Sequence, residues 1–284
     1  MVLQLISDKA QSLKEFTENN YAQGSFFWNY LLKNKDIKVN GVRVGKDVAL
    51  QAGDTVAYYL TKKQEEKPAY YIVYNDENVL VVDKESGVNA EAIFAALARE
   101  AVEQGEDCYF IHRLDRNTRG LMIFAKNAEM EAALLQAFKD RTVEKIYQAL
   151  CLGKFAKPTA MLKAYLKKDA DKSQVRIFDK PIKGAEEVIT EYRVLEAVGL
   201  DMTQVEVVLH TGKTHQIRAH LAYIGCPIVG DMKYGNSERN KALKISRQIL
   251  VAKTLRLRLS GRFSYLNDKE FTSRFVAELP TQTI

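Results

Sequence analysis

The segment Val143–Leu152 reads VEKIYQALCL, and its pattern indicates the class of fold. Its apolar and polar side chains alternate well enough to predict a β-strand with one buried face. The same pattern recurs in three further segments: Val188–Leu195, Thr203–His210 and Leu255–Leu259. Long strands with few helices predict an α+β domain around a largely antiparallel mixed sheet.

Outward from these strands, the chain alternates between compact apolar runs and helical patterns. Val79–Asp83 is rich in β-branched residues and predicts a buried strand, and Leu121–Ala125 predicts another. Helices are expected over three segments: Glu91–Glu103, the stretch from a cap at Asn127 to Asp140, and Lys213–Ile224. Gly225 follows the third helix and is suited to end it in a left-handed conformation.

A small module, residues 1–63, precedes this domain, and we call it the N-terminal module. Its helical spacing is marked by Leu13, Phe16, Phe27, Tyr30 and Leu31. Short strands follow, with turn signals at Asn40–Gly41 and Gly53–Asp54. The segment Lys62–Pro68, KKQEEKP, is charged and ends in proline, which is typical of a linker. We therefore expect a domain at 1–63, a linker at 64–69 and a second domain at 70–284.

The composition is that of an ordinary globular protein, with 46% hydrophobic and 27% charged residues among 284. No apolar run approaches the roughly 18 residues that span a bilayer, so we expect no membrane association. The start, Met1–Lys14, lacks the basic and apolar regions of a signal peptide. The three cysteines are far apart and odd in number, which favours a reducing cytoplasm. We expect a monomer.

The net charge is +6, which is compatible with a nucleic-acid partner. The charge is unevenly distributed, because Arg239–Arg262 contains eight basic residues and no acidic one. Two interpretations remain open for this stretch: a solvated strand face, or a surface for a polyanion.

The segment His112–Gly120, HRLDRNTRG, places one carboxylate, Asp115, among three arginines. A carboxylate in such a field stays ionised and can act as a nucleophile or as an electrostatic stabiliser. The alternative is a structural Arg–Asp pair that closes a turn, and the local sequence by itself favours this alternative.

Three of the four histidines lie within His210–His220, which raises the possibility of a metal site. His215 and His220 are five residues apart on the expected helix, so their side chains point about 140° apart and cannot share a tetrahedral ion. No HExxH or CxxC motif accompanies them. We expect no metal site.

Several motifs in order resemble the RluA family of pseudouridine synthases. His112–Asp115, with Thr118, Gly120 and Ala125–Lys126, resembles the catalytic motif of that family. Further matches are Tyr74–Lys84 with the entry strand, Lys145–Tyr147 with a lysine-x-tyrosine motif, and Gly212–Arg218, His220–Gly225, Pro227–Asp231 and Tyr234–Gly235 with the third motif. The matches extend over about Tyr70–Leu259, and their consistent order makes the resemblance specific.

The resemblance implies a role for each matched residue. Asp115 would be the catalytic carboxylate, and Arg218 would pair with it and keep it ionised. Tyr147 would stack on the target base, and Ile217 would line the apolar side of the pocket. Arg113 would help to hold the extruded nucleotide open. The family's reaction implies no cofactor.

Three positions depart from the family pattern. Arg119 stands in place of a serine, Glu85 in place of a proline, and Val251 where histidine is common. None of them replaces the aspartate, tyrosine or arginine of the expected site, so we expect activity to be retained. These departures leave the choice of RNA open.

The N-terminal module resembles an S4 RNA-binding domain over Leu32–Leu60. This resemblance implies a small α/β fold and suggests four residues for contact with RNA phosphates: Lys33, Lys35, Lys38 and Arg43. The alternative for these residues is ordinary surface charge.

Together these features predict an enzyme that isomerises specific uridines in structured RNA. Ribosomal RNA of the large subunit (23S) is the preferred substrate, because an S4-like domain often accompanies this catalytic domain there. Transfer RNA is the alternative, and an RNA-binding relative without catalysis is another. A hydrolytic N-glycosylase would need a second carboxylate near Asp115, and the local sequence has none. Because Asp115, Tyr147 and Arg218 lie beyond the linker, we expect the N-terminal module to affect RNA affinity and not turnover.

Overall fold

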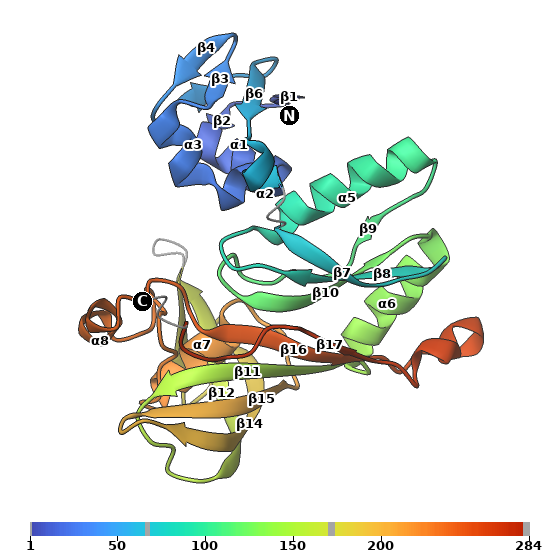
Figure 1. Cartoon of the computed structure of the whole chain (residues 1–284). Coiled ribbons are helices and arrows are strands. Elements are labelled where there is room, and N and C mark those ends of the chain that lie inside the picture. Colours follow the sequence, from blue (N-terminus) through green and yellow to red (C-terminus); the bar gives the residue numbers. More distant parts are fainter. Residues whose placement is uncertain (1, 66–68, 170–173, 281–284) are drawn as a thin grey trace. The chain divides into compact units, whose positions relative to one another are not determined.

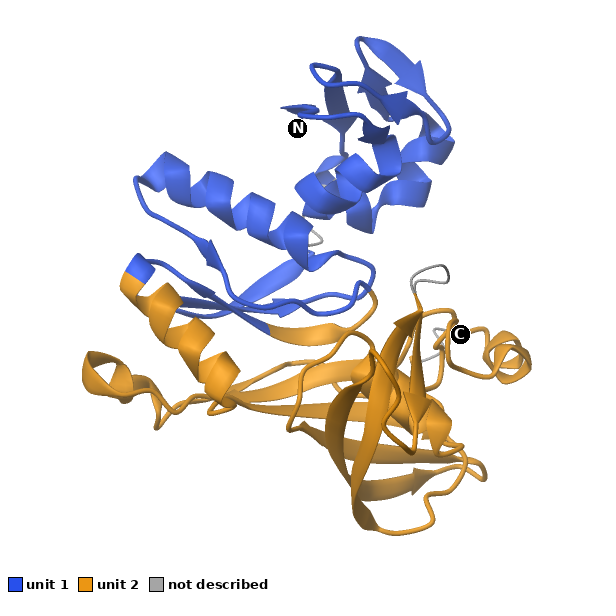
Figure 2. Cartoon of the chain, turned by 180° about the vertical axis from the view of Figure 1, so that it is seen from behind, with its two compact units in different colours: residues 1–116, 122–128 blue, residues 117–121, 129–284 orange. Residues whose placement is uncertain are grey.

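The computed structural model describes residues 2–65, 69–169 and 174–280. The chain divides into two compact units (Figure 2): unit 1 comprises residues 1–116 and 122–128, and unit 2 comprises residues 117–121 and 129–284. Strand β10 (Arg119–Ala125) and helix α6 (Ala128–Asp140) contribute residues to both units. Within the described ranges, no helix is long and apolar enough to cross a membrane.

The N-terminal module begins unit 1 and is drawn in blue in Figure 1. Its helices are α1 (Leu13–Asn20), α2 (Ala22–Phe26) and α3 (Trp28–Asn34). Its strands are β1 (Val2–Ile6), β2 (Gln11–Ser12), β3 (Ile37–Val39), β4 (Val42–Val44), β5 (Ala49–Leu50) and β6 (Thr55–Tyr59). Strands β1, β6, β3 and β4 form an antiparallel sheet in that order, and β2 pairs with β5.

Both predicted turns of the module are confirmed. Asn40 and Gly41 join β3 to β4 with φ angles of 48° and 82°, which only small or polar residues adopt readily. Gly53 has a φ angle of 91°, and the carboxylate of Asp54 accepts a 2.7 Å hydrogen bond from the amide of Gln51. The same carboxylate accepts a 2.8 Å bond from Nδ2 of Asn40, so the two turns are tied together.

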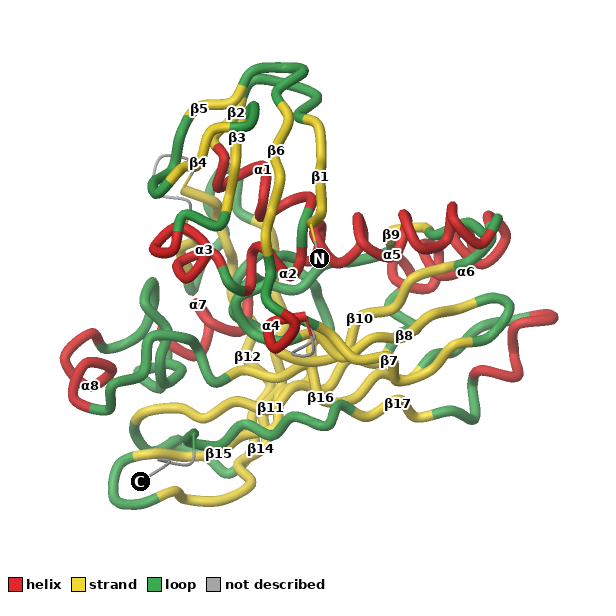
Figure 3. The backbone as a smooth tube through the Cα atoms, turned by 45° about the horizontal axis from the view of Figure 1, so that its top comes forward, coloured by secondary structure: helices red, strands yellow, loops and turns green. Residues whose placement is uncertain are grey.

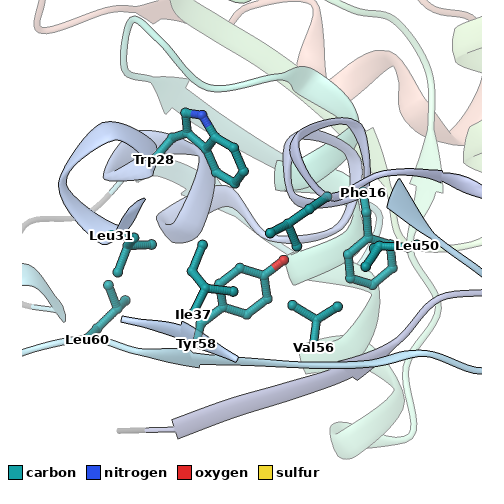
Figure 4. Close-up of a cluster of buried hydrophobic side chains, with 9 residues drawn as sticks. Phe16, Trp28, Leu31, Ile37, Leu50, Val56, Tyr58 and Leu60 are labelled. Carbon is teal, nitrogen blue, oxygen red and sulfur yellow. The ribbon is translucent and has the colours of Figure 1, made fainter. Parts of the chain in front are cut away.

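The core of the module combines side chains from its helices and its sheet. Figure 4 shows this cluster, which comprises Leu13, Phe16, Trp28, Leu31, Ile37, Leu50, Val56, Tyr58 and Leu60. The hydroxyl of Tyr58 is the polar group in its centre, 2.7 Å from Oγ1 of Thr17. Burial raises the pKa of Tyr58, so this phenol stays neutral and satisfied inside the core.

The first part of the predicted linker is a helical turn, α4 (Lys62–Glu65). Gln64 is buried there, and its Oε1 accepts a 2.8 Å hydrogen bond from the amide of Thr61. Its backbone carbonyl accepts a 2.7 Å bond from Gln23 of the module. Residues 66–68 of the predicted linker lie outside the described residues. The proposed boundaries at 63 and 70 remain a prediction.

The rest of unit 1 holds a helix and part of a sheet. The elements are β7 (Tyr70–Asn75), β8 (Val79–Lys84), α5 (Ala90–Gln104), β9 (Tyr109–Phe110) and the second half of β10. The predicted strand at Val79–Asp83 and the predicted helix at Glu91–Glu103 are confirmed within one residue at each end. The rings of Phe94, Phe110 and Phe124 lie 5.3 to 6.4 Å apart and join α5 to β9 and β10.

Unit 2 is built on a large sheet, visible in Figures 1 and 3. Its strands are β11 (Glu144–Leu152), β12 (Thr159–Asp169), β13 (Gln174–Phe178), β14 (Glu186–Val198), β15 (Met202–Leu209), β16 (Leu250–Arg256) and β17 (Glu270–Thr272). The order is β13-β12-β14-β15-β11-β16-β10, with β17 paired to β16. Its pairs are antiparallel except β10 with β16, which confirms a largely antiparallel mixed sheet.

The helical elements of unit 2, besides most of α6, are α7 (Gln216–Tyr223), α8 (Ser237–Ala242) and a 3-10 helix (Gly261–Leu266). Helix α7 packs through Ala219 against a cluster on β12, β13 and β14. It ends as predicted, because Gly225 has a φ angle of 81° and its amide bonds the carbonyl of Ala222.

Two predicted elements of unit 2 are placed differently. Helix α7 begins at Gln216 rather than at Lys213, because His215 takes a left-handed conformation with a φ angle of 55°. The strand expected at Leu255–Leu259 runs instead over Leu250–Arg256. Its residues Leu250, Val251 and Ala252 are buried beside β11, so pairing rather than local alternation determines its position.

Candidate active site

Asp115 lies half-buried on the loop between β9 and β10, in unit 1. The main chain of this loop is held by Lys84, which is fully buried. The ammonium group of Lys84 donates to the carbonyls of Glu85, Val88 and Arg116, each at 2.9 Å. An ammonium has three N–H groups, so this buried charge is fully satisfied by backbone. Lys84 therefore fixes the residue that directly follows Asp115.

The residues before Asp115 anchor the same loop from the other side. Nε2 of His112 accepts a 3.2 Å hydrogen bond from the amide of Ile123 in β10. Leu114 is buried, whereas the side chain of Arg113 is 67% exposed and pairs with Glu91 at 2.8 Å. Arg113 is thus held at the surface by a carboxylate on α5.

Two close contacts within unit 2 hold the start of β10, which follows Asp115 in the chain. The hydroxyl of Thr118 accepts a 2.9 Å hydrogen bond from Nε2 of Gln248, and both side chains are buried. Gly120 has a φ angle of 111°, and a β-carbon there would lie 2.2 Å from the carbonyl oxygen of Ala252. Glycine is the one residue that lets β10 approach β16 so closely.

Arg218 is a buried residue of α7, in unit 2, and it forms a bidentate ion pair with Asp231. Nε lies 2.7 Å and Nη2 3.0 Å from the two carboxylate oxygens. The amides of Lys233 and Tyr234 donate to the same carboxylate at 2.8 and 3.1 Å. Burial acts to raise the pKa of Asp231, but the hydrogen bonds and charge of Arg218 outweigh it, so this pKa lies below its ordinary value.

An aromatic side chain also lies beside Arg218. The ring centre of Tyr234 lies 5.2 Å from the guanidinium carbon, and its hydroxyl lies 2.9 Å from Nδ1 of His215. The amide of Val175 also donates to this hydroxyl, at 2.8 Å. The predicted pairing of Arg218 with Asp115 joins residues of different units and remains a prediction.

Tyr147 and Ile217 are both buried in unit 2. Tyr147 lies on β11, opposite Val207 of β15 and Ala252 of β16. Opposite Ile146 and Tyr147, the register passes from Thr254 to Ala252, so the extra residue of this bulge is Lys253 on β16. Strand β11 itself pairs with β15 without a shift, so Tyr147 keeps the regular alternation of its strand.

The histidine-rich segment holds its side chains in separate hydrogen bonds. His215 contacts Tyr234 from its position before α7, so the prediction that both histidines belong to one helix is wrong for His215. His220 is buried on α7, with Nδ1 3.0 Å from Oγ1 of Thr190. Burial lowers the pKa of His220 to about 4, so its ring is neutral at ordinary pH.

The four candidate RNA contacts of the N-terminal module are only partly brought together. Lys38 and Arg43 face each other across β3 and β4, and their cationic groups lie 5.2 and 5.5 Å from the ring centre of Tyr59. Arg43 also donates to the carbonyl of Lys35 at 2.7 Å and lies 3.5 Å from Asp36. Lys33 is exposed in the last turn of α3.

The basic stretch Arg239–Arg262 is less free than its sequence indicates. Three of its arginines are paired with acids from distant segments: Arg239 with Asp201, Arg256 with Glu144 and Glu270, and Arg262 with Glu129. A count of local acids does not detect such long-range pairing. This stretch therefore offers fewer charges to a polyanion than the sequence count implies.

Asp231 holds Arg218, and Lys84 holds the loop that carries Asp115. Neither residue is among the predicted site residues. A signal for Asp231 was present, because it is the one acid between residues 212 and 235. Lys145 is also absent from the predicted site residues. It lies two residues before Tyr147 on β11, so the two side chains share one face of the strand. Burial and the nearby Arg141 lower the pKa of Lys145.

Comparison with known proteins identifies clear relatives. The family model described as RNA pseudouridylate synthase matches residues 66–223. The ribosomal large subunit pseudouridine synthase C of Rickettsia conorii is 31% identical over 232 residues, covering 73% of this chain and 76% of that protein. The protein of the same name from Vibrio cholerae is 31% identical over 229 residues, covering 72% and 70%.

Solved structures agree with these matches. Human RNA pseudouridylate synthase domain containing 1 superposes with a TM-score of 0.59 at 26% identity, covering 67% of this chain and 79% of that one. Human RNA pseudouridylate synthase domain containing 4 superposes with a TM-score of 0.60 at 24% identity, covering 74% and 88%. The second likeness concerns the fold alone.

Proposed function

Because the chain belongs to the RNA pseudouridylate synthase family, we propose that it converts specific uridines of large-subunit ribosomal RNA to pseudouridine, with Asp115 as its catalytic carboxylate. The observation that carries this proposal is the extent of the family match. Residues 66–223 include Asp115, Tyr147, Ile217 and Arg218. The choice of ribosomal RNA rests on relatives named ribosomal large subunit pseudouridine synthase.

The reaction is an isomerisation. The bond between C1′ of the ribose and N1 of uracil breaks, the base turns, and a bond forms between C1′ and C5. The hydrogen on C5 is lost and N1 gains one, so the nucleotide keeps its composition. No electron acceptor or activated donor enters this balance, and we propose that the enzyme uses no cofactor.

The contacts around Asp115 within unit 1 and those of Arg218 within unit 2 support these roles. The backbone next to Asp115 is anchored by Lys84 and His112, and a fixed carboxylate can be aligned with a ribose carbon. A guanidinium carries five N–H groups, and Asp231 takes two of those on Arg218. From the resemblance of their motifs, we propose that Arg218 also pairs with Asp115. Tyr147 would stack on the uracil, and Ile217 would line the apolar side.

Arg113 is proposed to hold the extruded nucleotide open. Its exposure supports this role, because a guanidinium at the surface can reach a phosphate or a displaced base. RNA that binds Arg113 would then displace Glu91 from its ion pair with this arginine. In the N-terminal module, Lys33, Lys35, Lys38 and Arg43 are proposed as phosphate contacts, with Tyr59 beside two of them.

The test is Asp115→Asn, assayed on large-subunit ribosomal RNA transcripts labelled with tritium at C5 of uridine. Asparagine keeps the size of the side chain and removes its charge, so we expect tritium release to be abolished while folding and RNA binding persist. The wild-type enzyme is dialysed against EDTA beforehand and should stay active. Near-normal activity of the variant would refute the assignment of Asp115.

The substrate is tested separately by mapping pseudouridines in cells with and without the gene. We expect the loss of one or more pseudouridines from large-subunit ribosomal RNA. Loss confined to transfer RNA would replace the proposed substrate and leave the role of Asp115 intact.

A further inference from the structure

The N-terminal module is joined to the rest of unit 1 by more than the chain connection. Helices α1 and α2 pack against α5, and all three belong to unit 1 (Figure 2). Two arginines from beyond the linker reach the carboxyl end of α1. Nη1 of Arg99 donates to the carbonyl of Asn20, the last residue of α1, at 3.1 Å. A cation at this end is favoured by the helix dipole.

The second arginine is Arg116, the neighbour of Asp115. Its Nη1 forms an ion pair with the carboxylate of Glu18, two residues before Asn20 on α1. The Glu18 side chain is 18% exposed and that of Arg116 is 35% exposed. Partial burial shields this pair from solvent screening, so it is stronger than the fully exposed pairs of the molecule.

Arg116 is fixed at both its side chain and its main chain. Its Nε donates to the carbonyl of Gly87 at 3.2 Å. Its own carbonyl accepts bonds from the amide of Gly87 at 2.8 Å and from the ammonium of Lys84 at 2.9 Å. The guanidinium therefore connects Glu18 of the module to the loop that carries Asp115.

We propose that Glu18 is a positioning residue for Asp115, so that the N-terminal module sets the rate of the chemical step as well as RNA affinity. This inference rests on the proposed function of Asp115. Glu18 touches no reacting atom and acts through Arg116. It limits the conformations of the loop, and a loop with fewer conformations holds its carboxylate closer to the reactive geometry.

This inference reverses the expectation drawn from the sequence, in which the module affects affinity alone. That expectation treated the linker as a flexible connection between two independent parts, the N-terminal module and the second domain. The contact of Arg116 with Glu18 instead makes the carboxyl end of α1 part of the support of the loop, and Arg99 joins α1 to α5.

The test compares Glu18→Gln with Glu15→Gln in the full-length protein. Both changes remove one negative charge from α1, so they change the net charge of the protein equally. Glu18 also lies 4.0 Å from Lys14 in an i,i+4 pair, which Glu18→Gln removes as well. Glu15 is exposed in the first turn of α1, three residues before Glu18. Single-turnover rates of pseudouridine formation are measured at saturating RNA, and dissociation constants are measured in parallel.

We expect the saturated rate to fall about three- to tenfold in Glu18→Gln, the range for loss of one charge-assisted contact, and to stay unchanged in Glu15→Gln. The dissociation constants of the two variants should agree with each other. Hydrogen exchange in residues 112–117 of the free protein should become faster in Glu18→Gln only.

Equal saturated rates in the two variants would overturn the inference. The same conclusion would follow if Glu18→Gln changed the dissociation constant alone. Failure of the proposed function looks different, because wild type and Glu15→Gln would then both be inactive on the RNA. Thermal unfolding of both variants confirms that each is folded before its rate is compared.

Discussion

At the scale of single residues, the molecule keeps its buried charges in place with dedicated partners. Arg218 is held by Asp231 in two hydrogen bonds, and Lys84 is held by three backbone carbonyls. A buried charge is tolerated only when such partners satisfy it. Each of these groups is therefore fixed in position before any substrate arrives, which is the condition for efficient catalysis.

A prediction at this scale concerns Asp231→Asn. The amide keeps an acceptor for Lys233 and Tyr234 but leaves the buried guanidinium of Arg218 without its charge partner at this position. We expect the protein to lose about 3 kcal/mol of stability, the scale for breaking a buried pair, and to lose about tenfold or more in kcat. Urea unfolding and single-turnover kinetics measure both effects.

The matched control is Asp201→Asn, which removes the partner of Arg239 from an ion pair exposed on both sides. Exposed pairs contribute at most about 1 kcal/mol, so stability and kcat should stay near the wild-type values. If the two substitutions changed stability and kcat equally, Asp231 would contribute no more than an exposed surface charge.

The role of Asp231 could be predicted only in part from the sequence. The motif that contains it resembles a family segment, and it is the one acid in that stretch. Its partner, however, lies thirteen residues away on a helix, and the bidentate geometry arises from the fold of the chain after α7. The same holds for Lys84, whose partners extend to Arg116, thirty-two residues along the chain.

At the scale of elements, strand pairing determines which local patterns become structure. The strands expected at Val143–Leu152, Val188–Leu195 and Thr203–His210 are present, because their apolar faces are buried in the sheet. Strands β12 and β13 are absent from the predicted elements, although β12 alternates, with Lys163 and Lys167 on its exposed face. In the sheet, β12 pairs with β14 and β13 pairs with β12, and a local pattern does not reveal such pairing.

A prediction at this scale concerns Gly120→Ala in β10. The added β-carbon would meet the backbone of Ala252, so β10 and β16 must move apart. We expect a loss of about 3 kcal/mol or more in the free energy of unfolding, from steric overlap added to backbone strain. Gly105→Ala is the control, because that glycine also has a positive φ angle but nothing within 4 Å.

The control should lose only about 1 kcal/mol, the scale of left-handed strain alone. Urea titrations followed by far-UV circular dichroism give both values. If the two substitutions destabilised the protein equally, the close approach of β10 and β16 would not be the reason for glycine at position 120.

At the scale of the whole molecule, the sequence predicted the fold class and the family, and the structure adds the partners of individual side chains. The resemblance drawn from the ordered motifs is confirmed by the family match over residues 66–223. The S4-like character of the N-terminal module remains a prediction. Trp28 is the single tryptophan and lies in the core of this module, so tryptophan fluorescence reports on the module and not on unit 2.

A prediction at this scale concerns stability against pH. The pKa of His220 is about 4 in the folded protein and 6.5 ordinarily, so the unfolded chain binds more protons between these values. Stability is therefore fully present above about pH 6.5 and falls by up to about 3 kcal/mol as the pH drops towards 4. Urea titrations by far-UV circular dichroism at several pH values should show this slope, and His220→Asn should reduce it. An unchanged slope in the variant would assign the effect to other groups.

The contact of Gly120 with Ala252 also has a consequence for the history of this lineage. Any mutation at position 120 adds atoms where the neighbouring strand already lies, so selection should remove it in every organism that carries the protein. Position 119 is adjacent but exposed. Neighbouring residues in the same motif should therefore be replaced at very different rates, with glycine retained at position 120 and the residue at position 119 free to vary.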